Sequence, residues 1–441
     1  MNMSDCTKSN EFAEAAPLFS WDELGAGIMA RAQALAAHTE APGMMTRSFL
    51  TPAHHTAAAR LAAWMAEAGM SVRRDVVGNV IGRYEGIEPD APALLTGSHF
   101  DTVPNGGIYD GILGILLPIA CVARWHAQGR RFAHAIEVIG FAEEEGVRFK
   151  ATLLGSRAIA GAFDLRVLDH TDAAGVTMRQ AIDTAGLGYS CADLGAAAMD
   201  PARMLGFLEV HIEQGPVLLD AGLALGIVTG IAGATRMQVE VSGVAGHAGT
   251  VPMAGRRDAA MAAAEIALAI EQRCGGVEGL VGTVGQFDVP GGAANVVPGR
   301  ALFSIDVRAE QDGQREAAVA DILAAIDRIA ARRGVATQVR QTHEARSVPC
   351  APALCRQLDA ALRRAGLPAR RLPSGAGHDA MVIAARTDMA MLFVRCGNGG
   401  ISHNPLETMS AEDAALAARV ASDFIEHFQP SGSNDHKEYL A

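Results

Sequence analysis

The alternation of apolar and polar residues divides the chain into segments with the periods of helices and strands. Residues 20–38 and 51–69 repeat apolar positions at helical spacing, and 111–125 reads as an almost wholly apolar helix. Residues 93–97 and 134–146 contain short apolar runs that end in polar residues, which predicts buried strands. This succession predicts an α/β domain with a mixed central sheet flanked by helices.

The pattern changes after residue 226. A half-exposed strand at 234–243 is followed by further expected elements, namely a helix at 256–274, strands near 281–289 and 300–309, a helix at 311–333 and a strand at 335–343. This βαββαβ order is typical of an independent, ferredoxin-like α+β unit. We therefore expect a larger domain made of residues 18–225 and 346–430, interrupted by an inserted domain at 226–345. A cleft between two domains is a favoured site for small ligands.

Polar residues follow the expected strand at 93–97. The segment LLTGSHFDTVPNGGIYDGILG (94–114) contains His99, Asp101 and Asp110. Open α/β sheets place their sites at the carboxyl ends of strands, and imidazoles and carboxylates are ligands of Zn²⁺ and Mn²⁺. His99 and Asp101 are two residues apart, so one could bind metal while the other supports the imidazole. Any one of the three alone would more simply be a capping or core residue. Together they predict the start of a metal site.

Three consecutive acids follow the second apolar run. Runs of charge usually form solvated faces. Here Glu143, Glu144 and Glu145 come directly after VIGF and before a glycine, so at least two of their carboxylates should enter the crevice at the sheet edge. A hydrolase that uses metal-bound water needs one carboxylate as a ligand and another as a general base. Adjacent acids can divide those roles.

Two later histidines complete the predicted set. Strand alternation in EVHIEQG places His211 on the same side as Glu209 and Glu213, and His403 follows a glycine-rich turn in GGISHNPLE. The four segments together supply enough side chains for two metals that share one carboxylate: His99, Asp110, Glu145, His211 and His403.

The expected inserted domain carries polar residues of another kind. His247 lies between glycines in GVAGHAGTVPM, Asn295 lies in GGAANVVPG, and Arg308 follows Asp306 in FSIDVRAE. Each could be a turn or surface residue. An imidazole, an amide and a cation on a lid would also suit an anionic, hydrogen-bonding substrate. The turn SGAGHDAM (374–381) precedes a helix, so its backbone N–H groups could bind an anion.

Bulk properties narrow the class of protein. The 441 residues exceed one comfortable core, and 49% hydrophobic content suits a well-packed α/β fold. A net charge of −12 argues against nucleic acid or an anionic membrane as the main partner. No apolar run is long enough to span a membrane.

The cysteines and the chain ends point to the cytoplasm. The seven cysteines (6, 121, 191, 274, 350, 355 and 396) are an odd number without a CxxC pair, which suits reduced thiols. The segment MNMSDCTKSNEFAEAAP lacks the basic start and apolar core of a signal peptide. Residues 1–17 and 429–441 are polar, and we expect them to be frayed tails.

The motifs together resemble a known family. GSHFDTVPNGGIYDG, FAEEEGVRF, LLGSRAIAG, HIEQGPVL, GVAGHAGTVPM, GGAANVVPG, DVR, SGAGHDAM and SHNPLE are similar to the amidase and carbamoylase branch of the M20 metallopeptidases. That branch includes allantoate amidohydrolases, N-carbamoyl-L-amino acid hydrolases and β-ureidopropionases. The resemblance covers roughly residues 20–428, in the order of the family.

The resemblance implies a di-metal hydrolase that binds two divalent ions, Mn²⁺ or Zn²⁺. Asp110 would bridge both ions. Glu145 and His403 would complete the ligands of one ion, and His99 and His211 those of the other. The identity of the metal stays open, because histidine and carboxylate ligands suit both.

The same resemblance implies the remaining roles. Glu144 would be the general base, and Asp101 would orient His99. Substrate-binding positions would be Gln214, His247, Asn295, Arg308 and Gly377. Arg308 would hold a carboxylate, and His247 would stabilise the oxyanion, in the site of its own chain or in that of a partner subunit. The inserted domain would act as the lid and as the interface of a homodimer.

The resemblance also indicates the substrate class. Peptidases and deacylases of this fold typically have a carboxylate where this chain has His211, so the histidine favours carbamoyl or ureido compounds over dipeptides. Residues 46–86 are most similar to bacterial allantoate amidohydrolases, which implies hydrolysis of allantoate to ureidoglycine, ammonia and CO₂. The alternatives are an N-carbamoyl-L-amino acid hydrolase, a β-ureidopropionase, an exopeptidase or aminoacylase, and a non-catalytic scaffold. A scaffold predicts gaps in the ligand set, and the sequence has none.

Overall fold

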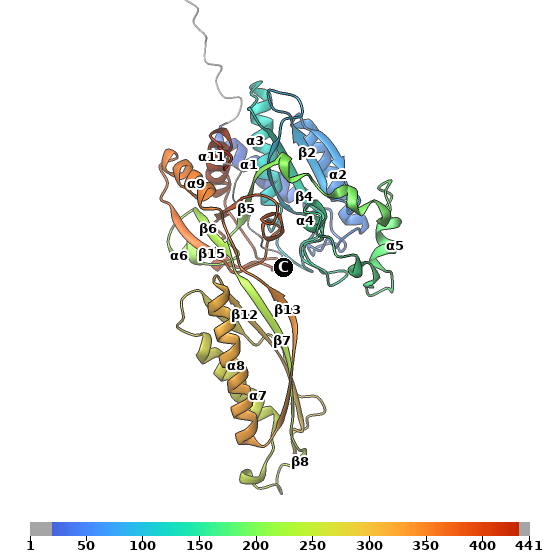
Figure 1. Cartoon of the computed structure of the whole chain (residues 1–441), viewed down its shortest axis with the longest axis vertical. Helices are drawn as coiled ribbons and strands as arrows, with labels where there is room; N and C mark the ends of the chain where they lie inside the picture. Colours follow the sequence, from blue (N-terminus) through green and yellow to red (C-terminus); the bar gives the residue numbers. More distant parts are fainter. Residues whose placement is uncertain (1–19, 432–441) are drawn as a thin grey trace, which may run out of the picture.

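A computed structural model describes residues 20–431 of the chain, which form two large β-sheets with separate hydrophobic cores and one small two-stranded sheet (Figure 1). The expected tail at 1–17 and most of the tail at 429–441 lie outside the described residues. Gln429 is not frayed, because its backbone N–H donates to Gln357 Oε1 and its carbonyl accepts from Gln357 Nε2. The expectation of a tail was therefore wrong at this residue.

The larger sheet is mixed, as predicted, and has the order β1-β2-β4-β3-β5-β16-β6-β14, with β15 also paired to β6. Its centre is parallel, because β3 runs parallel to both β4 and β5, and β5 runs parallel to β16. The strands are β1 (Ser71–Arg74), β2 (Val80–Tyr84), β3 (Ala93–His99), β4 (Ala135–Phe141), β5 (Met204–Ile212), β6 (Leu225–Ile231), β14 (Val348–Pro349), β15 (Arg370–Ser374) and β16 (Met389–Val394).

Helices flank this sheet, and their starts follow from the sequence. Ser20 caps the first helix by accepting from Glu23 N–H, while the Glu23 carboxylate accepts from Ser20 N–H. The apolar segment predicted at 111–125 forms α3, which packs against β3. The helices are α1 (Trp21–Leu35), α2 (Pro52–Glu67), α3 (Leu113–Ala127), α4 (Leu154–Ile159), α5 (Met178–Asp183), α6 (Val217–Asp220), α9 (Pro352–Arg364), α10 (Ala380–Ile383) and α11 (Ala411–Glu426).

The smaller sheet has the predicted βαββαβ order. It is antiparallel, with the order β10-β12-β7-β13. Both β9 and β10 pair with β12, each with a different part of that strand. The strand expected at 281–289 is thus divided in two. The elements are β7 (Gly233–Ser242), α7 (Ala259–Cys274), β9 (Leu280–Thr283), β10 (Phe287–Asp288), β12 (Arg300–Ala309), α8 (Asp312–Arg333) and β13 (Ala336–Ala345). A two-stranded ladder joins β8 (Gly246–His247) to β11 (Val296–Val297).

The smaller sheet extends away from the larger one, with α7 and α8 on one face (Figure 1). β6 still belongs to the larger sheet, so the chain crosses after Ile231, several residues beyond the boundary expected at 226. It returns after β13, since β14 pairs with β6. The division into domains and the role of this unit as a lid stay predictions.

Short 3₁₀ helices occupy several connections, at Leu165–Asp169, Cys191–Ala197, Pro201–Arg203, Met253–Gly255 and Asn398–Gly400. Among the helices of residues 20–431, none combines the length and the apolar character needed to cross a bilayer.

Candidate metal centre and cleft

The carboxyl ends of three parallel strands deliver the predicted side chains to one edge of the larger sheet. His99 ends β3, the three glutamates follow β4, and His211 lies near the end of β5. Gly97 permits the close pairing of β3 with β4, because its φ is +154° and a Cβ there would lie 2.0 Å from Ile139 O. The connection before α3 supplies Asp110, and the connection after Asn398–Gly400 supplies His403.

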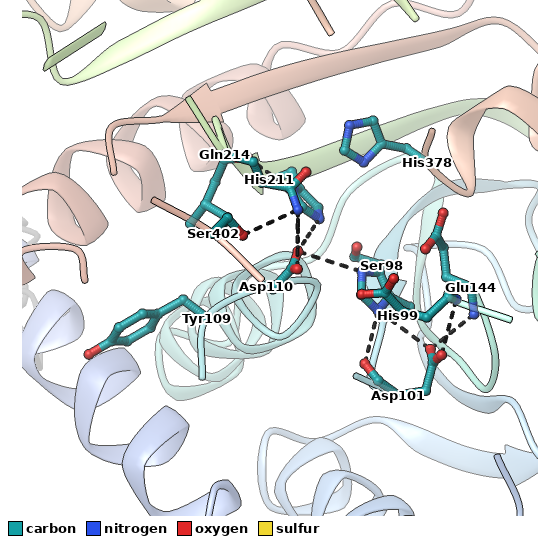
Figure 2. Close-up of polar contacts among 12 residues, drawn as sticks. Ser98, His99, Asp101, Tyr109, Asp110, Glu144, His211, Gln214, His378 and Ser402 are labelled. Atoms are coloured by element: carbon teal, nitrogen blue, oxygen red, sulfur yellow. Dashed lines mark hydrogen bonds and ion pairs between the residues drawn. The ribbon is translucent and has the colours of Figure 1, made fainter. Parts of the chain in front are cut away.

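Asp110 lies at the centre of this group (Figure 2). Its Oδ1 is 3.3 Å from His211 Nε2 and 3.8 Å from His99 Nε2, and its Oδ2 is 3.2 Å from His403 Nε2. Glu145 approaches the same histidine as Asp110 Oδ2, since its Oε1 is 3.6 Å from His403 Nε2. Two sets of possible ligand atoms, each within 4.8 Å of one another, therefore share the Asp110 carboxylate: His99, Asp110 and His211, and Asp110, Glu145 and His403.

These residues fit a divalent cation. The Nδ1 of His211 lies 2.8 Å from Ile212 O, so Nδ1 carries the proton and Nε2 is an acceptor. That Nε2 is buried, has no hydrogen-bond partner among residues 20–431, and faces a carboxylate oxygen, which is also an acceptor. Burial lowers the pKa of His211 to about 4, so its imidazole is neutral at physiological pH. Two facing acceptors without a proton between them call for a metal ion.

Asp101 supports two of the strand ends. Its carboxylate oxygens accept the backbone N–H groups of Glu144 at 3.0 Å and Glu145 at 3.1 Å. Its Oδ1 is also 3.4 Å from His99 Nδ1, and its backbone carbonyl is 3.1 Å from the same nitrogen. Asp101, which was predicted to orient His99, thus also fixes the backbone of Glu144 and Glu145.

The three glutamates separate as the sequence suggested. Glu143 is fully buried, whereas Glu144 and Glu145 line the cleft. Burial raises the pKa of Glu145 to about 7 and raises that of Glu144 well above its usual range. Atoms of Glu144 and Glu145 also approach His99 closely enough to form a third possible ligand set. The positions suit one metal-binding carboxylate and one proton acceptor.

Sequence reasoning missed Glu407, which holds the central carboxylate in place. Its Oε1 accepts the backbone N–H groups of Tyr109 at 3.0 Å and Asp110 at 3.2 Å. Its Oε2 accepts from Ser402 Oγ at 2.7 Å. Glu407 therefore joins the connection that carries Asp110 to the one that carries His403. Only its place in SHNPLE could have drawn attention to it.

A second missed group lies behind His211. His378 packs its ring 4.5 Å from the His211 ring, and its Nε2 is 2.8 Å from Ser374 Oγ. Glu209 is buried and accepts from Ser98 Oγ at 2.7 Å. The alternation of β5 placed Glu209 beside His211, but it did not reveal which partner would hold it.

A cleft of about 1840 Å³ extends from these residues to the smaller sheet. Three of the predicted substrate-binding residues line it. Gln214 Nε2 donates to Asp110 Oδ1 at 3.0 Å and to Oδ2 at 3.1 Å. Gly377 comes close to the metal centre, since a Cβ there would lie 3.9 Å from Glu144 Oε1. Arg308 reaches across from β12 and donates to Gly375 O at 2.8 Å.

Arg308 is also held within its own sheet. Its Nε and Nη2 donate to the two carboxylate oxygens of Asp306, at 3.0 and 2.9 Å. Arg236 Nε donates to the same carboxylate at 3.0 Å. This bidentate pairing fixes the plane of the guanidinium and leaves N–H groups for a ligand in the cleft.

The remaining two predicted residues do not reach this site within one chain. His247 is exposed on β8, and Asn295 O accepts from Ala248 N–H beside it. Neither residue lines the cleft that residues 20–431 enclose. Figure 1 shows β8 at the end of the smaller sheet that is farthest from the larger sheet. Within one chain, His247 and Asn295 therefore lie away from the metal centre.

Comparison with known proteins identifies the family. The pattern of peptidase family M20/M25/M40 matches residues 95–427 of the chain. The chain belongs to this family. A protein from Oryza sativa subsp. japonica named probable allantoate deiminase is 39% identical over 419 residues, which cover 88% of this chain and 85% of that protein. An N-carbamoyl-L-amino acid amidohydrolase from Geobacillus stearothermophilus is 40% identical over 378 residues, which cover 86% of this chain and 92% of that protein.

Solved structures agree with the M20 assignment. An amidase of the hydantoinase/carbamoylase family from Burkholderia multivorans superposes with a TM-score of 0.85 at 31% identity, and covers 92% of this chain and 98% of that one. The resemblance inferred from the motifs, and the mixed α/β fold it implied, are therefore confirmed. The M20 family is metal-dependent, which agrees with the ligand groups around Asp110.

Proposed function

We propose that this M20 protein is a metal-dependent hydrolase that cleaves a C–N bond of a carbamoyl or ureido group. The observation that carries the proposal is the pair of ligand sets that share Asp110, with Glu144 beside them in the same cleft. Relatives named allantoate deiminase and N-carbamoyl-L-amino acid amidohydrolase support the substrate class. The neutral imidazole of His211 would supply a nitrogen ligand, which the resemblance to the M20 family associates with carbamoyl and ureido substrates.

The ligand sets suit two ions, Mn²⁺ or Zn²⁺, with Asp110 between them. When bound, two such ions supply polarisation of the substrate carbonyl and a water of lowered pKa. Glu144 faces the cleft and takes the proton of the attacking water, then passes it to the leaving nitrogen. Asp101 keeps the Glu144 backbone in place through its hydrogen bond at 3.0 Å.

We favour allantoate as the substrate, with ureidoglycine, ammonia and CO₂ as the products. Arg308 presents its free N–H groups to the substrate carboxylate, and Gln214 lines the same cleft and donates to Asp110. An N-carbamoyl-L-amino acid offers the same carboxylate and the same scissile group. It is therefore the leading alternative, followed by 3-ureidopropionate.

We further propose a homodimer formed through the smaller sheet. His247 and Asn295 lie far from the metal centre of their own chain, so a second subunit would bring them to it. The apolar side chains of Met261 and Leu268 on α7 are 51% and 64% exposed, which suits a surface that a second subunit covers.

We also propose a cytoplasmic location. The six described cysteines are all unpaired, which fits a compartment that keeps thiols reduced.

Hydrolysis of four compounds tests the proposal, measured as ammonia release for the ureido and carbamoyl compounds and as new free amino groups for the dipeptide. The purified protein, supplied with Mn²⁺, is compared on allantoate, an N-carbamoyl-L-amino acid, 3-ureidopropionate and a dipeptide as control. We expect turnover of a ureido or carbamoyl compound, fastest with allantoate, and none of the dipeptide. Cleavage of the dipeptide alone would favour an exopeptidase. A protein without bound divalent metal and without turnover would favour a scaffold.

A further inference from the structure

Arg157 is a half-buried cation in the cleft that has no acidic partner of its own. It lies on α4, beside the glutamate segment, and lines the cleft. Among residues 20–431 it forms no salt bridge, and its hydrogen bond from Nε to Thr152 O is long, at 3.4 Å. Asp164 acts on it only from a distance, because that carboxylate is paired with Arg166. A half-buried guanidinium with free donors is suited to a ligand that brings oxygen atoms.

On the opposite wall, Thr342 and His343 of β13 line the cleft at an irregularity of the strand. The pairing of β13 with β7 shifts register between Gln341 and His343, so Thr342 is an extra residue. Both residues line the cleft; Thr342 Oγ1 donates to Arg236 O at 3.2 Å, and His343 is half-buried. Bulges of this kind re-aim side chains and are common beside active sites.

His343 lies within electrostatic reach of Arg157 on the facing wall and of Arg308. Burial lowers the pKa of His343, and the positive charges of Arg236, Arg308 and Arg157 lower it further. His343 is therefore a neutral imidazole close to the arginines. The cleft of about 1840 Å³ also exceeds the roughly 300–1,000 Å³ that holds a drug-sized ligand, so it has room beyond the metal centre.

We propose that Arg157 and His343, with Thr342, form a second polar subsite that receives a side arm of the substrate ending in oxygen acceptors. This inference rests on the proposed function. In this arrangement Arg308 holds the substrate carboxylate, the metal centre holds the scissile group, and the third substituent of the substrate carbon is left to this subsite. A second ureido group or a carboxylate would accept from Arg157, whereas an alkyl arm would leave its donors unpaired. The subsite therefore selects the substrate by its side arm.

Replacement of Arg157 tests this role. Arg157→Met keeps the length of the side chain but removes its donors. We expect it to lower kcat/KM for allantoate and N-carbamoyl-L-aspartate by about 10- to 100-fold, the usual effect of losing a charged hydrogen-bond donor. For N-carbamoyl-L-valine, which has an alkyl arm, kcat/KM should change by no more than about 2-fold. Arg157→Lys should restore part of the lost activity.

Two further variants make the result specific. His343 is half-exposed and lies on the opposite wall of the cleft. His343→Asn should therefore also lower kcat/KM for allantoate and N-carbamoyl-L-aspartate relative to N-carbamoyl-L-valine. Lys150→Met removes an exposed cation that also lines the cleft, and it should leave the ratio of polar-arm to alkyl-arm activity unchanged. Unfolding temperatures confirm that the variants are folded.

The outcomes separate this inference from the proposed function. An equal loss on all three substrates in Arg157→Met, or no loss on any, would overturn the subsite. A native protein that cleaves only alkyl-arm compounds would also overturn it, while leaving carbamoyl hydrolysis intact. Failure of the native protein on every carbamoyl and ureido compound would instead refute the proposed function on which the subsite depends.

Discussion

The carboxylate of Glu407 accepts the backbone N–H of Asp110 at 3.2 Å, and so fixes the residue that both ligand sets share. The same carboxylate binds Tyr109 N–H and Ser402 Oγ. Gly107 leaves the necessary space, because a Cβ there would lie 2.0 Å from Glu407 Oε1. Glu407 thus positions the metal centre without being one of its predicted ligands.

Glu407→Ala should therefore weaken metal binding. Loss of the carboxylate frees the connection that carries Asp110, and we expect metal affinity to fall about 10- to 100-fold, as is usual for residues that orient ligands. Titration of the metal-free protein with Mn²⁺ measures the change. Glu407→Gln keeps one acceptor oxygen and should recover part of the affinity. Glu88→Ala, on an exposed loop, is the matched control. Undiminished affinity in Glu407→Ala would contradict this role.

Glu144→Gln should separate metal binding from catalysis. The substitution keeps the size of the side chain but removes the proton acceptor in the cleft. We expect turnover to fall about 10²- to 10⁴-fold, the usual contribution of a general base. Metal content, measured by elemental analysis, should stay at the native level, because the ligand sets around Asp110 remain. Near-native turnover would show that another group accepts the proton.

The sequence was sufficient for the fold and for the residues that meet at the sheet edge, because both follow from local patterns. Apolar runs that end in polar residues located β3 and β4, and strand alternation located β5. Their parallel pairing brings His99, Glu145 and His211 together. The role of Glu407 was not predictable, since its hydrogen bonds join residues about 300 positions apart. His247 shows a second limit, because its sequence context predicted a role at the site, whereas in the folded chain it does not line the cleft.

The buried imidazole of His54 should make stability depend on pH. Its Nε2 is 2.7 Å from Ala142 O, its ring stacks on Phe100, and burial lowers its pKa well below 6.5. In the unfolded chain His54 binds a proton below about pH 6.5, whereas the folded protein resists it. The unfolded state thus holds more protons, and the free energy of unfolding falls as the pH drops, by about 1.4 kcal/mol per unit for this residue.

His54→Gln measures that contribution, because the Gln amide can still donate to Ala142 O but does not titrate. We compare the two proteins by urea unfolding at pH 7.5, 6.5 and 5.5. The variant should lose less stability than the native protein between pH 6.5 and 5.5, and the two should run parallel above pH 7. Equal losses across the whole range would mean that His54 is protonated in the folded state.

Mixed dimers decide which active site His247 serves. His247→Ala and Glu144→Gln should each nearly abolish activity as pure dimers. In a hybrid of the two, a histidine that acts across the interface gives one site with both groups intact and one site that lacks both. Random mixing then restores about a quarter of native activity, since half of the dimers are hybrids with one working site. If His247 acted within its own chain, every hybrid site would carry one defect and mixing would restore nothing. The recovery of ammonia release after subunit exchange, with native dimers carried through the same exchange as the control, therefore distinguishes the two arrangements.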